Sequence, residues 1–208
     1  MRYGYAVVHQ AAAHCLGYPD AAIHTATPLV RSSLETASGP AAGALLAFLD
    51  HVAATGPGDS AEHYVRVFDF DRNSLHLSWW TDGDTRRRGQ ALVRFVEVYR
   101  AEGLEFAGGE LPDFLPAVLE FTAQTGQTAL LHEHRPALEL LRFSLADAES
   151  PYARVLEAVC ATLPGPSPRD RAAARELARS GPPREDVGLE PYGHLAQLPL
   201  LSGSGDHR

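Results

Sequence analysis

The stretch LHEHRPALELLRFSL, residues 131–145, decides the fold class of this chain. Leu131, His134, Leu138, Leu141 and Leu145 recur in it at steps of three and four residues. This spacing is the period of one apolar face of an α-helix. The proline inside the run predicts a kink or a fresh helix start, because it lacks the N–H that a helix interior uses.

The chain that follows continues the helical pattern and then loses it. Residues 150–163 begin with Ser-Pro and place apolar side chains at helical spacing, so they predict another helix. Residues 164–180 read as a proline-rich linker and one peripheral helix, whose apolar face is mostly alanine. Residues 181–208 are rich in glycine, proline and histidine, and we predict a flexible tail there.

Toward the N-terminus the same period predicts further helices, with almost no strand-like alternation. They are expected at about 3–16 with Tyr5 facing inward, from 21 to about 37, around 45–53, from Asp59 or Ser60 through Phe68, from an Asp84 cap to Gly103, and from an Asp113 cap onward. Residues 69–80 read as a connection that carries bulky aromatics. We therefore predict an all-α, single-domain helical bundle of about eight to nine helices over residues 1–163.

Composition limits the class of partner. The chain has 208 residues and a formal net charge of −8 at pH 7. An acidic surface disfavours nucleic acid and anionic membranes, and it favours a basic or neutral partner. We find no run of about 18 apolar residues that would span a membrane, and no secretory signal. We therefore expect a cytoplasmic protein with no stable membrane insertion.

Residues that could carry catalysis or bind a metal are sparse. Cys15 and Cys160 are far apart and fit apolar helix faces, so we interpret them as small buried hydrophobes. His132, Glu133 and His134 resemble metal ligands, but histidines two apart on a helix point away from each other. We therefore predict no catalytic and no metal-binding residues, with a metal enzyme built on these three residues as the distant alternative.

Three successive arginines, Arg86, Arg87 and Arg88, fall in the first turn of a predicted helix. A helix N-terminus carries positive partial charge, so cations there break a local rule. Such violations concentrate at functional sites. Two interpretations stay open, which are structural ion pairing with Asp82 and Asp84, and contact with a ligand or partner.

Several segments together resemble a known family, the molybdoenzyme-specific chaperones, which have a TorD-like fold. The likeness is strongest to the branch of nitrate reductase molybdenum cofactor assembly chaperones, also called delta chains. It rests on residues 8–20, 64–70, 81–89, 110–116 and 150–163, in order. Two motifs carry most of it, YVRVF at 64–68 and ELPDF at 110–114. The second departs from the family's Glu-Pro-x-Asp-His pattern, because phenylalanine stands where histidine is usual.

The resemblance implies a chaperone that binds the N-terminal segment of the catalytic (alpha) subunit of respiratory nitrate reductase. It would hold that subunit until the molybdenum cofactor is inserted into it, and would bind no cofactor stably itself. Alternatives are a chaperone for a different molybdoenzyme or a non-catalytic helical scaffold. The residues expected to bind the peptide are Tyr64, Val67, Phe68, Asp69, Arg87, Glu110, Pro112, Asp113 and Phe114.

Tyr64 and Phe68 are four residues apart and so share one helix face. Two interpretations of this aromatic pair are open. The rings line a groove that receives a basic amphipathic helix, or they are simply part of the core.

Overall fold

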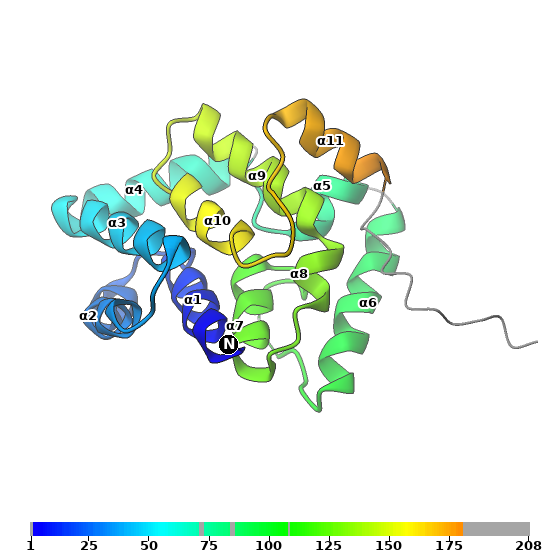
Figure 1. Cartoon of the computed structure of the whole chain (residues 1–208), viewed down its shortest axis with the longest axis horizontal. Coiled ribbons are helices and arrows are strands. Elements are labelled where there is room, and N and C mark those ends of the chain that lie inside the picture. Colours follow the sequence, from blue (N-terminus) through cyan, green and yellow to red (C-terminus); the bar gives the residue numbers. More distant parts are fainter. Residues whose placement is uncertain (1, 71–72, 84–85, 108, 181–208) are drawn as a thin grey trace, which may run out of the picture.

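The computed structural model of the chain describes residues 2–70, 73–83, 86–107 and 109–180 (Figure 1). Within these ranges the structure is helical, and its β content is one isolated antiparallel bridge between His76 and Phe114. The elements are α1 (Arg2–Cys15), α2 (Ala21–Glu35), α3 (Pro40–Ala54), α4 (Pro57–Val65), the π-helix η1 (Arg66–Phe70), α5 (Leu77–Asp82), α6 (Arg86–Ala101), α7 (Leu115–Thr125), α8 (Ala129–Glu133), α9 (Arg135–Asp147), α10 (Ala153–Cys160) and α11 (Arg171–Ser180). The predicted all-α class is confirmed.

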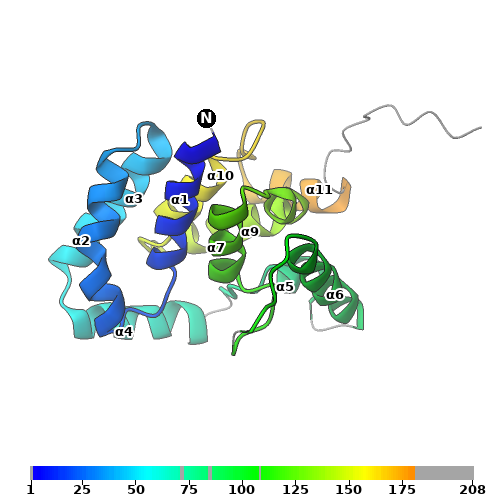
Figure 2. The ribbon, with the colours of Figure 1, turned by 90° about the horizontal axis from the view of Figure 1, so that it is seen from below.

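Helix α1 lies in the middle of the bundle, where it packs against α7, α10, α2 and α3. Figure 2 shows α2, α3 and α4 at one end of the molecule and α5 and α6 at the other, with α1, α7, α9 and α10 between them. Helix α11 packs on α9. In the described ranges, no helix combines the length and the apolar character that a membrane crossing needs.

The core forms around the small and apolar face of α1. Val8, Ala12 and Leu16 are buried at helical spacing, and the run of alanines beside them lets α7 approach closely. The interpretation of the two cysteines as buried hydrophobes is confirmed, since both thiols are free and buried. Burial raises the pKa of Cys15 to about 12 and also raises the pKa of Cys160.

The leucine run that predicted the fold spans two helices. Helix α8 ends at Glu133 and α9 begins at Arg135, so the fresh start predicted at Pro136 is confirmed. The proline lies in the first turn of α9, where the missing N–H costs no hydrogen bond. Four leucines of the run are fully buried, Leu131, Leu138, Leu141 and Leu145.

Three sequence predictions about the helices were wrong. The expected connection at 69–80 contains the end of η1 and most of α5. At six residues, α5 is too short to show a helical period. The fourth helix begins at Pro57, before the predicted cap. Tyr5, expected on the inner face of α1, is 49% exposed. The predicted Asp84 cap and the predicted tail at 181–208 lie outside the described residues, and the domain boundary at residue 163 stays a prediction.

The predicted cap of α7 was also wrong. The helix begins at Leu115, and its N-cap residue is Phe114, which makes no side-chain capping bond. The carboxylate of Asp113 is instead fully buried and bonded elsewhere. Pro116 lies in the first turn of the helix, where it costs no hydrogen bond.

Candidate functional site

A cavity of about 720 Å³ opens where the end of α4 and η1 face α5 and the segment that leads into α7. We call it the aromatic groove. Its lining residues are Gly17, Tyr18, Tyr64, Phe68, Asp69, Phe70, Ser74, Leu75, His76, Trp79, Glu110 and Phe114. Among them are Tyr64, Phe68, Asp69, Glu110 and Phe114, which the sequence predicted as binding residues. The fold thus brings the two predicted motifs to one cavity.

The inner wall of the groove is a cluster of rings in edge-to-face and tilted contact. The Tyr64 ring centroid lies 4.8 Å from that of Phe68 and 5.5 Å from that of Tyr18. Phe68 in turn packs on Tyr152 at 4.9 Å. Tyr64 is 8% exposed, and its hydroxyl donates to the Leu16 carbonyl at 3.2 Å. Tyr64 is therefore a core residue whose edge lines the groove, whereas Phe68 is half-buried.

The outer rim of the groove consists of aromatic rings that the sequence did not identify as binding residues. Phe70 is 82% exposed, Tyr18 50% and Trp79 39%. Phe70 closes η1, whose wider π-turn carries the chain out of α4. The signal in the sequence was an aromatic side chain in each segment expected to be a loop, but exposure depends on the tertiary packing. Exposed rings grouped around one cavity are typical of an interaction site.

The opposite wall is held by a buried carboxylate. Asp113 Oδ2 accepts from the Ser78 amide at 3.1 Å and from the Ser78 hydroxyl at 2.5 Å. Asp113 Oδ1 lies 3.0 Å from His76 Nδ1, and His76 Nε2 is 3.6 Å from a Glu110 carboxylate oxygen. The residues around the start of α5 are thereby joined to the segment that leads into α7, which fixes the groove wall that carries Glu110.

The electrostatics of Asp113 fit this structural role. Burial by itself raises the pKa of Asp113, but the bonds from His76 and Ser78 outweigh it and leave the pKa below its ordinary value. Backbone bonds reinforce the junction, from the Leu77 amide to the Asp113 carbonyl at 3.0 Å and from the Leu115 amide to the Leu75 carbonyl at 2.8 Å. Asp113 therefore positions the wall and has no exposed surface for a partner.

Two other predicted binding residues also act from behind the groove. Val67 is 3% exposed, and its carbonyl accepts from Asn73 Nδ2 at 3.1 Å. The Pro112 carbonyl accepts from the Tyr99 hydroxyl at 2.7 Å. Neither residue lines the aromatic groove. Both support the backbone of the segments that do.

The three arginines at the start of α6 have different surroundings. Arg88 turns inward, and its Nε donates to the Ser78 hydroxyl at 3.3 Å. Arg86 and Arg87 are exposed on α6, and neither lines the aromatic groove. The predicted contact between Arg87 and a partner stays a prediction.

The groove combines an aromatic floor with negative edges. Asp69 and Glu110 are both exposed at the cavity. Burial raises the pKa of Tyr64 to about 12, with smaller contributions from the charges of Asp69 and Glu110. The negative charges of these two carboxylates therefore influence the Tyr64 hydroxyl, whose ring lies at the floor of the groove. The arrangement suits a ligand that presents apolar side chains together with positive charge.

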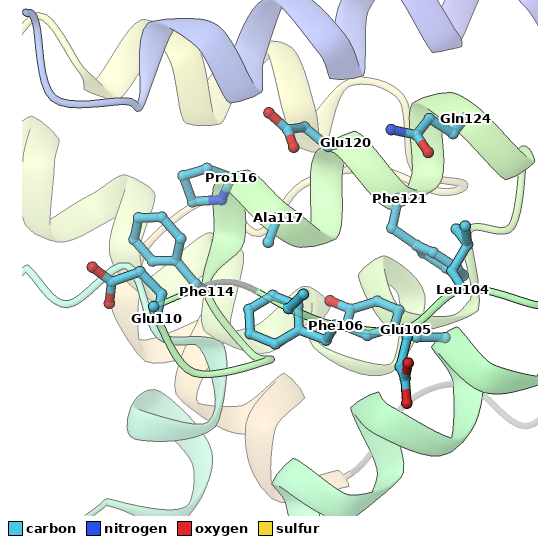
Figure 3. Close-up of a pocket in the computed structure, with 13 residues that line it drawn as sticks. Leu104, Glu105, Phe106, Glu110, Phe114, Pro116, Ala117, Glu120, Phe121 and Gln124 are labelled. Atoms are coloured by element: carbon cyan, nitrogen blue, oxygen red, sulfur yellow. The ribbon is translucent and has the colours of Figure 1, made fainter.

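A second cavity of about 400 Å³ adjoins the first. We call it the α7 groove, and Figure 3 shows the side chains that line it. Ala117 and Phe121 of α7 face Leu104 and Phe106 of the segment after α6. Glu110 and Phe114 also line the aromatic groove, so they form the wall between the two cavities.

Two of the three residues considered for a metal site make other contacts within the chain. His134 stands between α8 and α9, and its ring stacks on Phe95 with centroids 4.7 Å apart. Glu133 accepts from Arg94 at 2.8 Å. Among the residues that the structure describes, no group of three or more His, Cys, Asp or Glu side chains is placed to hold a metal ion.

Comparison with known proteins places this sequence in a family. The sequence model of the family described as "Nitrate reductase delta subunit" matches residues 32–158, which include both groove motifs. The chain belongs to the nitrate reductase delta subunit family.

Several known proteins are similar to more than half of this chain. The chain is 38% identical over 161 residues to "Nitrate reductase-like protein NarX" of Mycobacterium tuberculosis, covering 75% of this chain and 24% of that protein. It is 35% identical over 145 residues to "Nitrate reductase molybdenum cofactor assembly chaperone NarJ" of Escherichia coli, covering 66% and 61%. It is 30% identical over 123 residues to the "Probable" NarJ chaperone of Bacillus subtilis, covering 57% and 67%. The chain thus spans about a quarter and about three fifths of the first two relatives.

Membership of the delta subunit family confirms the resemblance seen in the sequence. Phe114, where the expected motif has histidine, lies beside an imidazole from another segment. The imidazole that reaches the Asp113 carboxylate in this chain belongs to His76, on the opposite segment. The Phe114 ring packs on that imidazole with centroids 5.5 Å apart. The Phe114 ring therefore presents apolar surface to both grooves.

Proposed function

We propose that this chain is a cytoplasmic, non-catalytic assembly chaperone for respiratory nitrate reductase. It binds the N-terminal segment of the catalytic (alpha) subunit in the aromatic groove. It holds the apo-subunit until the molybdenum cofactor has been inserted and the complex assembles at the membrane. The observation that carries this proposal is the meeting of both family motifs at one acidic, aromatic cavity.

The apolar part of the groove supports binding of an amphipathic helix. Such a helix lays its apolar face into a groove through residues spaced three or four apart. The exposed rings of Phe70 and Trp79 provide large, rigid contact area beside the half-buried Phe68. Aromatic side chains of this kind dominate binding energy when a partner covers them.

The charge distribution supports a basic partner. The exposed carboxylates of Asp69 and Glu110 stand at the groove, and the chain as a whole has a net charge of −8. Complementary charge raises the association rate and suppresses wrong partners more than it adds affinity. Binding should therefore weaken as salt is raised, because exposed charges are screened beyond about 10 Å at 0.1 M.

A holding role is also consistent with the chemistry of the groove. Its buried carboxylate, Asp113, is engaged by Ser78 and His76. The two thiols of the chain, Cys15 and Cys160, are buried with raised pKa values, which disfavours the reactive thiolate. In this proposal the cofactor is inserted into the partner, and the chaperone contributes binding and timing.

The test combines cells and purified protein. Deleting the gene should leave nitrate reductase subunits present but without molybdenum cofactor, measured by metal content of the purified subunits. Fully metallated enzyme from the deletion strain would contradict the proposal.

Titration calorimetry should show the chain binding a peptide of the catalytic subunit's N-terminus, more weakly at high salt. Leu29→Ala is the matched control, because Leu29 is a 72% exposed apolar residue on α2, outside both grooves. Tighter binding of the leader segment of a different molybdoenzyme would reassign the partner. If the chain binds no such segment, the remaining interpretation is a non-catalytic helical scaffold.

A further inference from the structure

We propose that the docked segment carries a second apolar anchor, and that this anchor enters the α7 groove next to the aromatic groove. The inference rests on the proposed function, because the occupant is the same basic amphipathic segment. It adds a requirement on that segment, which is two apolar anchors with a positively charged residue between them.

The shape of the α7 groove fits an apolar side chain. Figure 3 shows Phe106 facing Ala117 across the cavity, with Leu104 and Phe121 at one end. The volume of about 400 Å³ lies at the lower end of the range for ligand pockets. Ala117 and Phe106 are half-buried, so apolar surface at the floor is open to a partner.

The rim of the α7 groove is acidic. Glu105, Glu110 and Glu120 are all exposed, and Figure 3 shows Glu105 and Glu120 on opposite sides of the cavity. No basic side chain is among the described residues that line it. An apolar anchor flanked by positive charge is complementary to this surface, whereas a second copy of this acidic chain is not.

Continuity with the aromatic groove identifies the occupant. Glu110 and Phe114 line both cavities, so the two sites are separated by one wall. A segment that crosses this wall places its middle residue over the exposed Glu110 carboxylate, which favours Arg or Lys at that position. On a helix the two anchors would be four or seven residues apart, about 6 or 10 Å along the axis.

The experiment fills the α7 groove and leaves the aromatic groove intact. Ala117→Phe adds a ring at the floor of the second cavity, and Ala172→Phe adds the same ring at an exposed position of α11 as the matched control. The probe is a synthetic peptide of about 20 residues from the N-terminus of the catalytic subunit, long enough to span about 30 Å as a helix. A set of peptides with each apolar residue changed to alanine accompanies it.

We expect Ala117→Phe to weaken binding of the full peptide at least tenfold, with Ala172→Phe equal to wild type. One alanine-substituted peptide should bind wild type more weakly and should lose nothing further on Ala117→Phe, which identifies the second anchor. Equal binding of the full peptide by wild type and a folded Ala117→Phe variant would overturn the second anchor alone. Absence of binding to wild type would instead overturn the proposed function.

A second variant covers the case in which Ala117→Phe lowers the thermal unfolding temperature. Glu105→Gln combined with Glu120→Gln changes two exposed side chains, so folding should be unaffected. This variant should bind the peptide more weakly at low salt and converge with wild type at high salt. Identical salt dependence for both proteins would overturn the acidic-rim part of the inference.

Discussion

Tyr152 belongs to an inner region of aromatic rings and Phe70 to an outer region, and the two regions use the same kind of side chain for different purposes. Tyr152 is 4% exposed and packs on Phe48, Tyr64 and Phe68 with ring centroids 4.9 to 6.0 Å apart. Phe70 is 82% exposed at the rim of the aromatic groove. Burial decides whether a ring contributes to the free energy of unfolding or is available to a partner. The inner rings hold the groove in shape, and the outer rings are its contact surface.

The largest effect should come from the inner region. Tyr152→Ala removes a ring at the centre of the cluster, so we expect the free energy of unfolding to fall by about 3–5 kcal/mol. Urea denaturation followed by circular dichroism would measure it. An unchanged midpoint would show that the inner rings do not support the fold and would remove the distinction between the two regions.

Phe68 lies between the two regions and should show both effects. It packs on Tyr64 and Tyr152 and also lines the groove. Phe68→Ala should lower the free energy of unfolding by about 1–3 kcal/mol, less than Tyr152→Ala, because the half-buried ring leaves a smaller cavity. Peptide binding by the folded variant, measured by calorimetry, should also weaken. A change in only one of the two quantities would assign Phe68 to one region.

Phe70→Ala should act on binding alone. The free energy of unfolding should stay within about 0.5 kcal/mol of wild type, as for most surface changes. Affinity for the N-terminal peptide should fall by about 2 kcal/mol, roughly 30-fold, if the ring is a main contact. Loss of stability comparable to that of Tyr152→Ala would contradict the division. Leu29→Ala serves as the exposed control and should alter neither quantity.

The smallest effect should be a dependence on pH that comes from the inner region. The His63 ring stacks on Tyr152 with centroids 5.8 Å apart, and Arg66 Nη2 lies 3.0 Å from His63 Nδ1. Burial, and then the charges of Arg66 and His51, lower the pKa of His63 below its usual value. The unfolded chain therefore binds a proton before the folded chain does. Stability should be highest above about pH 6.5 and fall as pH drops below it.

This dependence can be measured by thermal unfolding at pH 7.5 and 5.5. His63→Gln should lose less stability over that interval than wild type does. Other buried histidines contribute to the wild-type slope, so the difference between the two proteins is the relevant quantity. An equal slope in both would show that His63 does not take part.

The helices could be predicted because their apolar faces are long. The spacing of the leucines in residues 131–145 predicted a helix, and the proline among them predicted the interruption at Pro136. Helix α5 was missed because six residues show less than two turns of any period. Asp113 looked like a cap because aspartate precedes helices often. The local sequence gave no sign that its carboxylate would be buried against Ser78.

The site was predicted in part for a similar reason. The motifs that contain Tyr64 and Glu110 were recognisable, and the fold brings them to one groove. Tyr18, Phe70 and Trp79 were not identified, because the exposure of a ring depends on how the segments around it pack in the folded chain. The role of Val67 as a support rather than a contact also depends on tertiary packing. Motifs therefore locate a groove, and packing decides which of its residues face outward.

The π-helix η1 has a consequence for how the groove can change in evolution. A π-turn holds one residue more than an α-turn, so the direction of Phe68 and Phe70 depends on the length of the segment as well as on its composition. A π-turn accommodates its extra residue locally, so deleting a single codon within residues 66–70 would restore ordinary helical winding and leave the direction of the chain after residue 70 nearly unchanged. A change of one residue in this segment would therefore alter which rings reach the groove, without a substitution in the buried core.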